Sequence, residues 1–82
     1  MIFLRLSELK ANQSAIVHYI DNNLNIKRRL EDLGVISGTL ITCTAKSPLG
    51  DPSAYRIRQT IIALRKQDAQ HIIIGEVSPW IK

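Results

Sequence analysis

The chain has 82 residues, of which 45% are hydrophobic, and its 11 Lys and Arg residues outnumber its 7 Asp and Glu residues, which gives a net charge of +4 at neutral pH. A chain this short buries only about 60–65% of the surface that its unfolded form exposes, which argues against a deep catalytic cleft and excludes a second domain. The apolar content is sufficient for folding, so we expect one domain over residues 1–82.

The cysteine content and the apolar stretches of the sequence indicate the cellular compartment of the protein. Cys43 is the one cysteine, which excludes an intrachain disulfide and favours a reducing environment. The apolar start of the chain is interrupted at Arg5, and no stretch approaches the roughly 20 apolar residues that cross a bilayer. We therefore expect a cytoplasmic protein that does not insert directly into a membrane.

The first third of the chain predicts a short turn and then a strand. Ser7 precedes Glu8 and Leu9 and is predicted to cap a short helix or turn. The segment from Ser14 to Ile20 is rich in β-branched and aromatic residues and is bounded by polar residues on both sides, which indicates a strand.

A helical period begins at Leu24. Ile26, Leu30 and Leu33 follow at spacings of four and three residues, which places them on one stripe that we expect to face the core. Gly34 stands where a left-handed residue commonly closes a helix. The polar residues that are candidates for capping the helix start are Asp21, Asn22 and Asn23.

Short strands dominate the remainder of the chain. Alternating or β-branched segments predict strands at Leu40–Ala45, Ala54–Arg58, Thr60–Leu64 and His71–Val77. A turn near Gln59 joins the second and third of these as a hairpin, and Lys66–Gln70 is long enough for one helical turn. About five short strands and one α-helix favour a mainly β fold, a small and strongly bent barrel. The core positions that we expect are Leu30, Leu33, Ile41, Ile57, Leu64 and Ile72.

Residues suited to catalysis or metal binding are scarce. The sequence has no phosphate-binding glycine loop, no HExxH and no CxxC, so we predict no enzyme, no catalytic residue and no cofactor. A transition-metal set could in principle be drawn from His18, Cys43, His71 and Glu76. Their spacing gives that set no support, and we predict no metal site.

Basic residues raise the alternative of nucleic-acid binding. They gather on the helix and around the hairpin, as Lys27, Arg28, Arg29, Arg56, Arg58 and Arg65. The aromatic residues that would stack on bases are scattered, as Phe3, Tyr19, Tyr55 and Trp80. We therefore favour solvated charges, some paired with Glu31, Asp51 or Asp68, and leave open whether Trp80 folds back over the barrel or contacts a partner.

Three segments, in this order, resemble the FeoA family of ferrous-iron transport accessory proteins: RRLEDLGVISGTLI, SPLGDP and RIRQTIIALRKQDAQHIII. The resemblance covers nearly the whole chain. Asn12 and Gln59 stand where the family usually has glycine. Asn tolerates a positive φ, whereas Gln59 puts the tight turn of the hairpin in doubt.

The resemblance implies an SH3-like β-barrel that acts in the bacterial cytoplasm with the FeoB permease and its GTPase domain. On this basis we expect an accessory protein that binds FeoB and supports or regulates Fe²⁺ uptake through protein contact. The residues that we expect to bind this partner, on the helix and in the Pro-rich loop, are Leu24, Lys27, Arg28, Leu49, Gly50 and Asp51.

Two alternatives come from another functional class. One is a small nucleic-acid-binding barrel, and the other is an SH3-like regulatory domain of the type found in metal-dependent repressors. We do not expect nucleic acid as a partner, and we leave self-association open.

Overall fold

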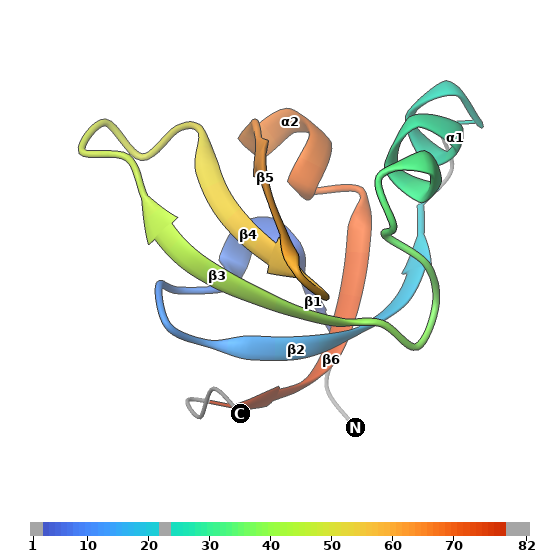
Figure 1. The fold of residues 1–82 in the computed structure, drawn as a ribbon, viewed down its shortest axis with the longest axis horizontal. Coiled ribbons are helices and arrows are strands. Elements are labelled where there is room, and N and C mark those ends of the chain that lie inside the picture. The colour runs from blue at the N-terminus through green and yellow to red at the C-terminus, as the bar shows by residue number, and fades with distance from the viewer. Residues whose placement is uncertain (1–2, 22–23, 79–82) are drawn as a thin grey trace.

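The structure is a computed structural model that describes residues 3–21 and 24–78. In these ranges a 6-stranded antiparallel sheet has the order β1-β6-β2-β3-β4-β5 and curls into a small barrel (Figure 1). The elements are β1 (Leu4–Arg5), the 3-10 helix η1 (Leu6–Glu8), β2 (Ser14–Ile20), α1 (Leu24–Asp32), β3 (Leu40–Lys46), β4 (Ser53–Ile57), β5 (Thr60–Leu64), α2 (Lys66–Ala69) and β6 (Ile72–Ser78).

The mainly β barrel with one longer helix confirms the predicted fold class. The segments predicted as strands all form strands, with ends that shift by at most one residue. The additional strand is β1, which pairs with β6 through Leu4 and Ile74. Two residues are too few to display an alternating pattern, so the sequence could not reveal this strand.

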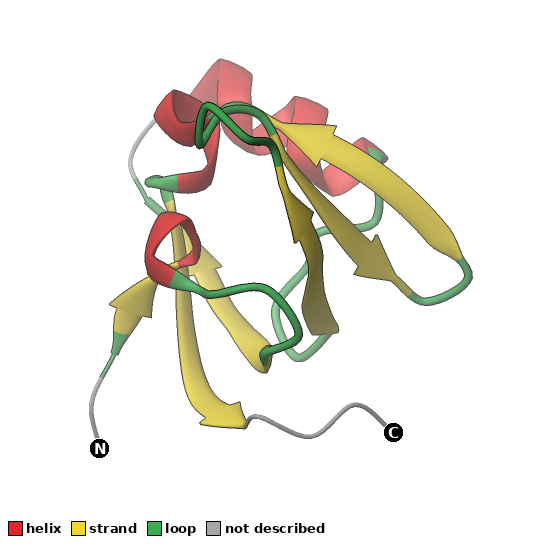
Figure 2. Cartoon of the chain, turned by 90° about the vertical axis from the view of Figure 1, so that its left-hand side faces the viewer, coloured by secondary structure: helices red, strands yellow, loops and turns green. Residues whose placement is uncertain are grey.

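The core lies inside the curled sheet. The strands curl around one interior (Figure 2), and side chains from every strand pack together in the core cluster. Ala15 faces Ile41 across β2 and β3, and Ile41 faces Ile57 across β3 and β4, so the inner face is aliphatic across three strands. Burial of this apolar surface is the main force that stabilises the barrel.

The end of α1 decides which residues of the helical stripe reach the core. The Gly34 N–H donates to Glu31 O at 3.0 Å and the Val35 N–H donates to Leu30 O at 2.9 Å, which is a Schellman motif, and Gly34 has a φ of +102° as predicted. Leu30 and Val35 are both fully buried. The prediction that Leu33 is a core residue is wrong, because the helix ends at Asp32 and Leu33 lies 44% exposed in the turn.

The two positions that depart from the FeoA pattern are accommodated differently. Asn12 has a φ of 70°, as its tolerance for this region predicts. The hairpin turn forms over Arg58 and Gln59, but Arg58 takes the positive φ, at 57°. Gln59 therefore does not prevent the tight turn, because the residue with the positive φ is Arg58.

The cap of the first helical turn differs from the prediction. The N-cap residue of η1 is Arg5, so the assignment of Ser7 to that role is wrong. Glu8 accepts a hydrogen bond from the Arg5 backbone N–H at 2.8 Å, because its carboxylate lies three residues further on and can reach back. The predicted caps of α1 at Asn22 and Asn23 lie outside the described residues.

Candidate functional site

The residues predicted to bind a partner lie in two separate places. Lys27 and Arg28 are exposed on α1, and the side chain of Leu24 lies outside the described part of the chain. Leu49 is 94% exposed at the tip of the β3–β4 loop. Figure 1 shows α1 and this loop at opposite ends of a molecule that extends 30 × 30 × 24 Å. The structure therefore does not bring the two segments together on one face.

The β3–β4 loop holds Leu49 outward by a network of its own. The Ser47 hydroxyl donates to Asp51 O at 3.0 Å and accepts from the Asp51 N–H at 3.2 Å, while the Gly50 N–H donates to Ser47 O at 2.8 Å. The Asp51 carboxylate accepts from the Lys66 N–H at 2.8 Å, which ties the loop to α2. Because these hydrogen bonds already restrict the loop, binding of a partner to Leu49 would cost little further loop entropy.

A surface depression of about 400 Å³ lies beside β3 and β4, at a place that the sequence did not single out. Ile36 and Leu40, at 41% and 43% exposure, are large apolar side chains on its wall. The exposure of Ile36 could not be read from the sequence, where it resembles any core residue. The lining residues are Ile36, Ser37, Gly38, Thr39, Leu40, Thr42, Arg56 and Arg58.

The basic residues do not all behave alike. Arg29 forms an ion pair with Asp68 at 3.0 Å, which confirms that pairing among those predicted. Arg56 and Arg58 are exposed, and among the described residues neither guanidinium group has a hydrogen-bond or ion-pair partner. Two unpaired guanidinium groups therefore stand at one edge of the depression.

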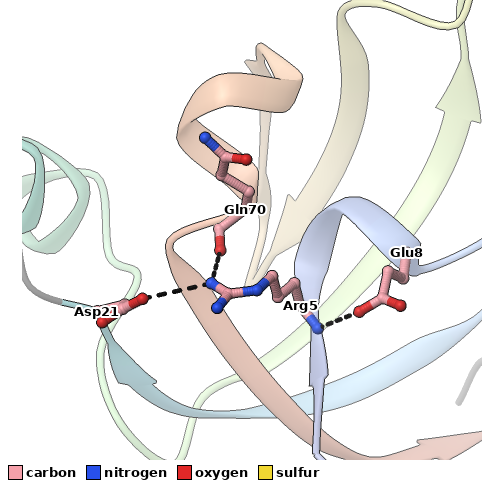
Figure 3. A network of polar contacts seen from close by, with 4 residues as sticks. All are labelled: Arg5, Glu8, Asp21 and Gln70. Carbon is pink, nitrogen blue, oxygen red and sulfur yellow. Dashed lines mark hydrogen bonds and ion pairs between the residues drawn. The ribbon is translucent and has the colours of Figure 1, made fainter.

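Arg5 is a second arginine whose side chain is bound within the structure. Arg5 donates through Nη1 to Gln70 O at 2.6 Å and to the Asp21 carboxylate at 3.3 Å, while its backbone binds Glu8 (Figure 3). These contacts join β1, the end of β2 and the turn before β6. The role of Arg5 is to tie these elements together rather than to offer a free charge.

The candidate metal ligands are not gathered into a site. His18 packs edge-on against Phe3, with ring centroids 4.5 Å apart, and Cys43 is buried in the core. Over residues 3–21 and 24–78, no group of three or more His, Cys, Asp or Glu side chains is placed to hold a metal ion. The side chain of Glu76 lies outside the described part, as does Trp80.

The environment of Cys43 makes its thiol unreactive. Burial raises the pKa of the Cys43 thiol, and the charge of Lys46 and a hydrogen bond with the Ala45 backbone offset this only in part. The thiolate is the nucleophile, so a buried thiol with a raised pKa reacts slowly.

We expect Cys43 in the native protein at pH 8 to react with a disulfide reagent such as DTNB at least about a hundredfold more slowly than in guanidinium chloride. Absorbance at the wavelength of the released thiolate measures both rates. A native rate equal to the unfolded rate would show that the thiol is accessible and that its burial is not maintained in solution.

The described residues contain no helix that is long and apolar enough to cross a membrane.

Comparison with known proteins matches the chain to the FeoA family. The sequence model of the FeoA domain matches residues 4–75. A Porphyromonas gingivalis protein, named Fe(2+) transport protein A/Fe(2+) transporter FeoB fusion protein, is 32% identical over 75 residues. This similarity covers 92% of the chain and 9% of that relative, so the chain spans a small part of the relative's length.

Solved structures share the fold. An FeoA-like protein from Clostridium acetobutylicum is 31% identical, with a TM-score of 0.85 over 92% of this chain and 87% of that one. FeoA from Stenotrophomonas maltophilia, crystallised with zinc and described as a prokaryotic SH3 domain protein, is 32% identical, with a TM-score of 0.81 over 92% of this chain and 95% of that one. The barrel is therefore SH3-like.

Proposed function

The chain belongs to the FeoA family, and from this we propose that it is a non-catalytic accessory protein that binds a FeoB-type ferrous-iron transporter and supports or regulates Fe²⁺ uptake. The observation that carries this proposal is the Porphyromonas gingivalis relative, whose name joins transport protein A and transporter FeoB in one polypeptide. A covalent link raises the local concentration of two parts, which is useful when those parts contact each other.

The partner is the cytoplasmic part of the transporter, including its GTPase domain, so the chain acts in the cytoplasm. Two features of the described surface suit protein contact. Leu49 is an exposed aliphatic side chain on a fixed loop, and α1 exposes Lys27 and Arg28 at the other end. Because these features lie far apart, they would contact different parts of the transporter (Figure 1).

Co-purification tests the function directly. The tagged protein, expressed in its own cells and extracted in mild detergent, should bring with it a large membrane protein that has a GTPase domain. Loss of the gene should lower Fe²⁺ uptake. If the purified transporter fails to bind the protein and uptake is unchanged without it, the proposal is wrong.

Two substitutions test the two contact surfaces. We expect Leu49→Ala to weaken transporter binding by about tenfold, because an exposed apolar anchor concentrates binding energy, and Arg28→Glu to weaken it by about threefold or more. Affinity for the purified transporter and Fe²⁺ uptake in complemented cells are the measurements.

The matched control for charge reversal is Lys10→Glu, an exposed lysine outside both segments that is hydrogen-bonded to Gln13 through its backbone N–H and C=O. This variant should bind as the wild type does. If Leu49→Ala and Arg28→Glu, both folded, also bind and transport like the wild type, the two segments are not the contact surfaces.

A further inference from the structure

The depression beside β3 and β4 has the chemistry of a peptide-docking site. We propose that it binds a short extended segment of a partner protein that carries carboxylate and aliphatic side chains, with Arg56 and Arg58 pairing with the carboxylates. The inference rests on the proposed function in one respect, because the transporter is the protein expected to supply this segment.

Strand register places Arg56 between Thr42 and Ile61. Thr42 lies opposite Arg56 across β3 and β4, and Arg56 lies opposite Ile61 across β4 and β5. Residues that face each other across antiparallel strands point to the same side, so these three form one row. The neighbouring row, which contains Ile41 and Ile57, is buried in the core, so the row with Arg56 lies on the other side of the sheet. Arg56 and Ile61 are exposed there, whereas Thr42 is only 4% exposed.

The opposite wall of the depression is fixed before any partner arrives. The Gly38 N–H donates to Val17 O at 2.8 Å, the Val17 N–H donates to Thr39 O at 2.9 Å, and the Thr39 N–H donates to Ile36 O at 3.1 Å. A Cβ placed on Gly38 would meet no atom within 4 Å, so the backbone there is open to a ligand. A preformed wall reduces the entropy cost of docking.

Charge identifies the occupant. Arg5 and Arg29 are paired with Asp21 and Asp68, whereas Arg56 and Arg58 lack a counter-charge among the described residues. A guanidinium group presents a planar fork of donors that matches a carboxylate.

Apolar side chains flank the two arginines. Ile36 and Leu40 form part of the wall, and Ile61, 59% exposed, continues the surface beyond Arg56. No aromatic residue appears among the described lining residues, so bases would have nothing on which to stack. An acidic segment with aliphatic residues therefore fits this surface better than a nucleic acid does.

The first experiment measures binding of the full chain to the purified FeoB-type transporter from the same cells. We expect Arg56→Glu and Arg58→Glu each to weaken binding by at least about tenfold, whereas Lys10→Glu, the matched charge reversal, should stay within about twofold. Arg56→Gln and Arg58→Gln, which remove the charge without reversing it, should also weaken binding to the transporter. Thermal unfolding and an NMR spectrum of each variant establish that it is folded.

The second experiment needs no transporter. A capped peptide of alternating Glu and Leu is titrated into the isotope-labelled chain, and a Gln–Leu peptide of the same length is the control. We expect chemical-shift changes to concentrate at Thr39, Leu40, Arg56 and Arg58 with the acidic peptide, and to be much weaker with the control peptide or with Arg56→Glu.

The two experiments separate the proposals. If the transporter does not bind but the acidic peptide maps to the depression, the docking site stands and the proposed partner is wrong. If the transporter binds and the arginine variants bind equally well, or if the Gln–Leu peptide binds as the acidic one does, the docking inference is overturned. A short DNA duplex that displaces the acidic peptide and depends on both arginines would also overturn it, in favour of a nucleic-acid interface.

Discussion

Leu30→Ala is expected to destabilise the protein by about 3 kcal/mol. Leu30 packs in the core and is 0% exposed to solvent. Its backbone carbonyl accepts the hydrogen bond that closes the Schellman motif at the end of α1. Truncation removes buried methyl groups at the point where the helix joins the barrel, and leaves a cavity beside Val35.

Leu33→Ala is the matched control, because it deletes the same atoms three residues away at a position that is 44% exposed. Its expected cost is below about 1 kcal/mol. Chemical denaturation followed by circular dichroism gives both free energies of unfolding. Equal losses for the two variants would contradict the assignment of Leu30 to the core and of Leu33 to the surface.

Gly75→Ala is expected to cost about 2 kcal/mol, because a strand position with no side chain lies under the His18 ring. A Cβ on Gly75 would lie 2.6 Å from His18 Nε2, 2.8 Å from His18 Cδ2 and 3.4 Å from Phe3 Cδ1. His18 is half-buried and its ring packs against Phe3, so it can move away only by giving up that contact.

A double-mutant cycle with His18→Ala isolates this clash. With the imidazole removed, Gly75→Ala should cost less than about 1 kcal/mol, since the nearest atoms are then absent. Free energies of unfolding for the wild type, the two single variants and the double variant provide the coupling energy. If Gly75→Ala costs the same with and without His18, contact with the ring is not the cause.

Local signals were enough to predict much of the fold. The β-branched segment from Ser14 to Ile20 forms a strand with those bounds, and Gly34 ends α1 in the expected left-handed conformation. Both features depend on neighbours within a few residues, which is the range over which a sequence pattern carries information. The SH3-like barrel followed from the resemblance to FeoA, and the FeoA domain match and solved relatives confirm it.

Other features of the fold were not predicted from the sequence. Leu33 continues the helical stripe in sequence, but the positive φ of Gly34 turns the chain so that Val35 takes the buried place. The β3–β4 loop and α1 both project from the barrel, and only the three-dimensional arrangement shows that they project from opposite ends (Figure 1).

The candidate docking site also could not be predicted, because it is formed by segments that lie far apart in the sequence. Arg56 comes from β4, and Ile36 from the connection between α1 and β3. Strand pairing brings these segments together across about 20 positions of sequence, so no motif could mark the site. The absence of ion-pair partners for Arg56 and Arg58 among the described residues likewise becomes visible only when the surrounding carboxylates are placed.

The attachment of α1 has a consequence for motion. Among the described side chains of this helix, Leu30 alone is fully buried, and Ile26 is half-buried. An element held through so few apolar contacts can open locally while the strands remain paired, so its amide protons exchange with solvent sooner than those of β2 and β3. The end of the molecule that carries Lys27 and Arg28 can thus adjust to a partner without disturbing the sheet that supports it.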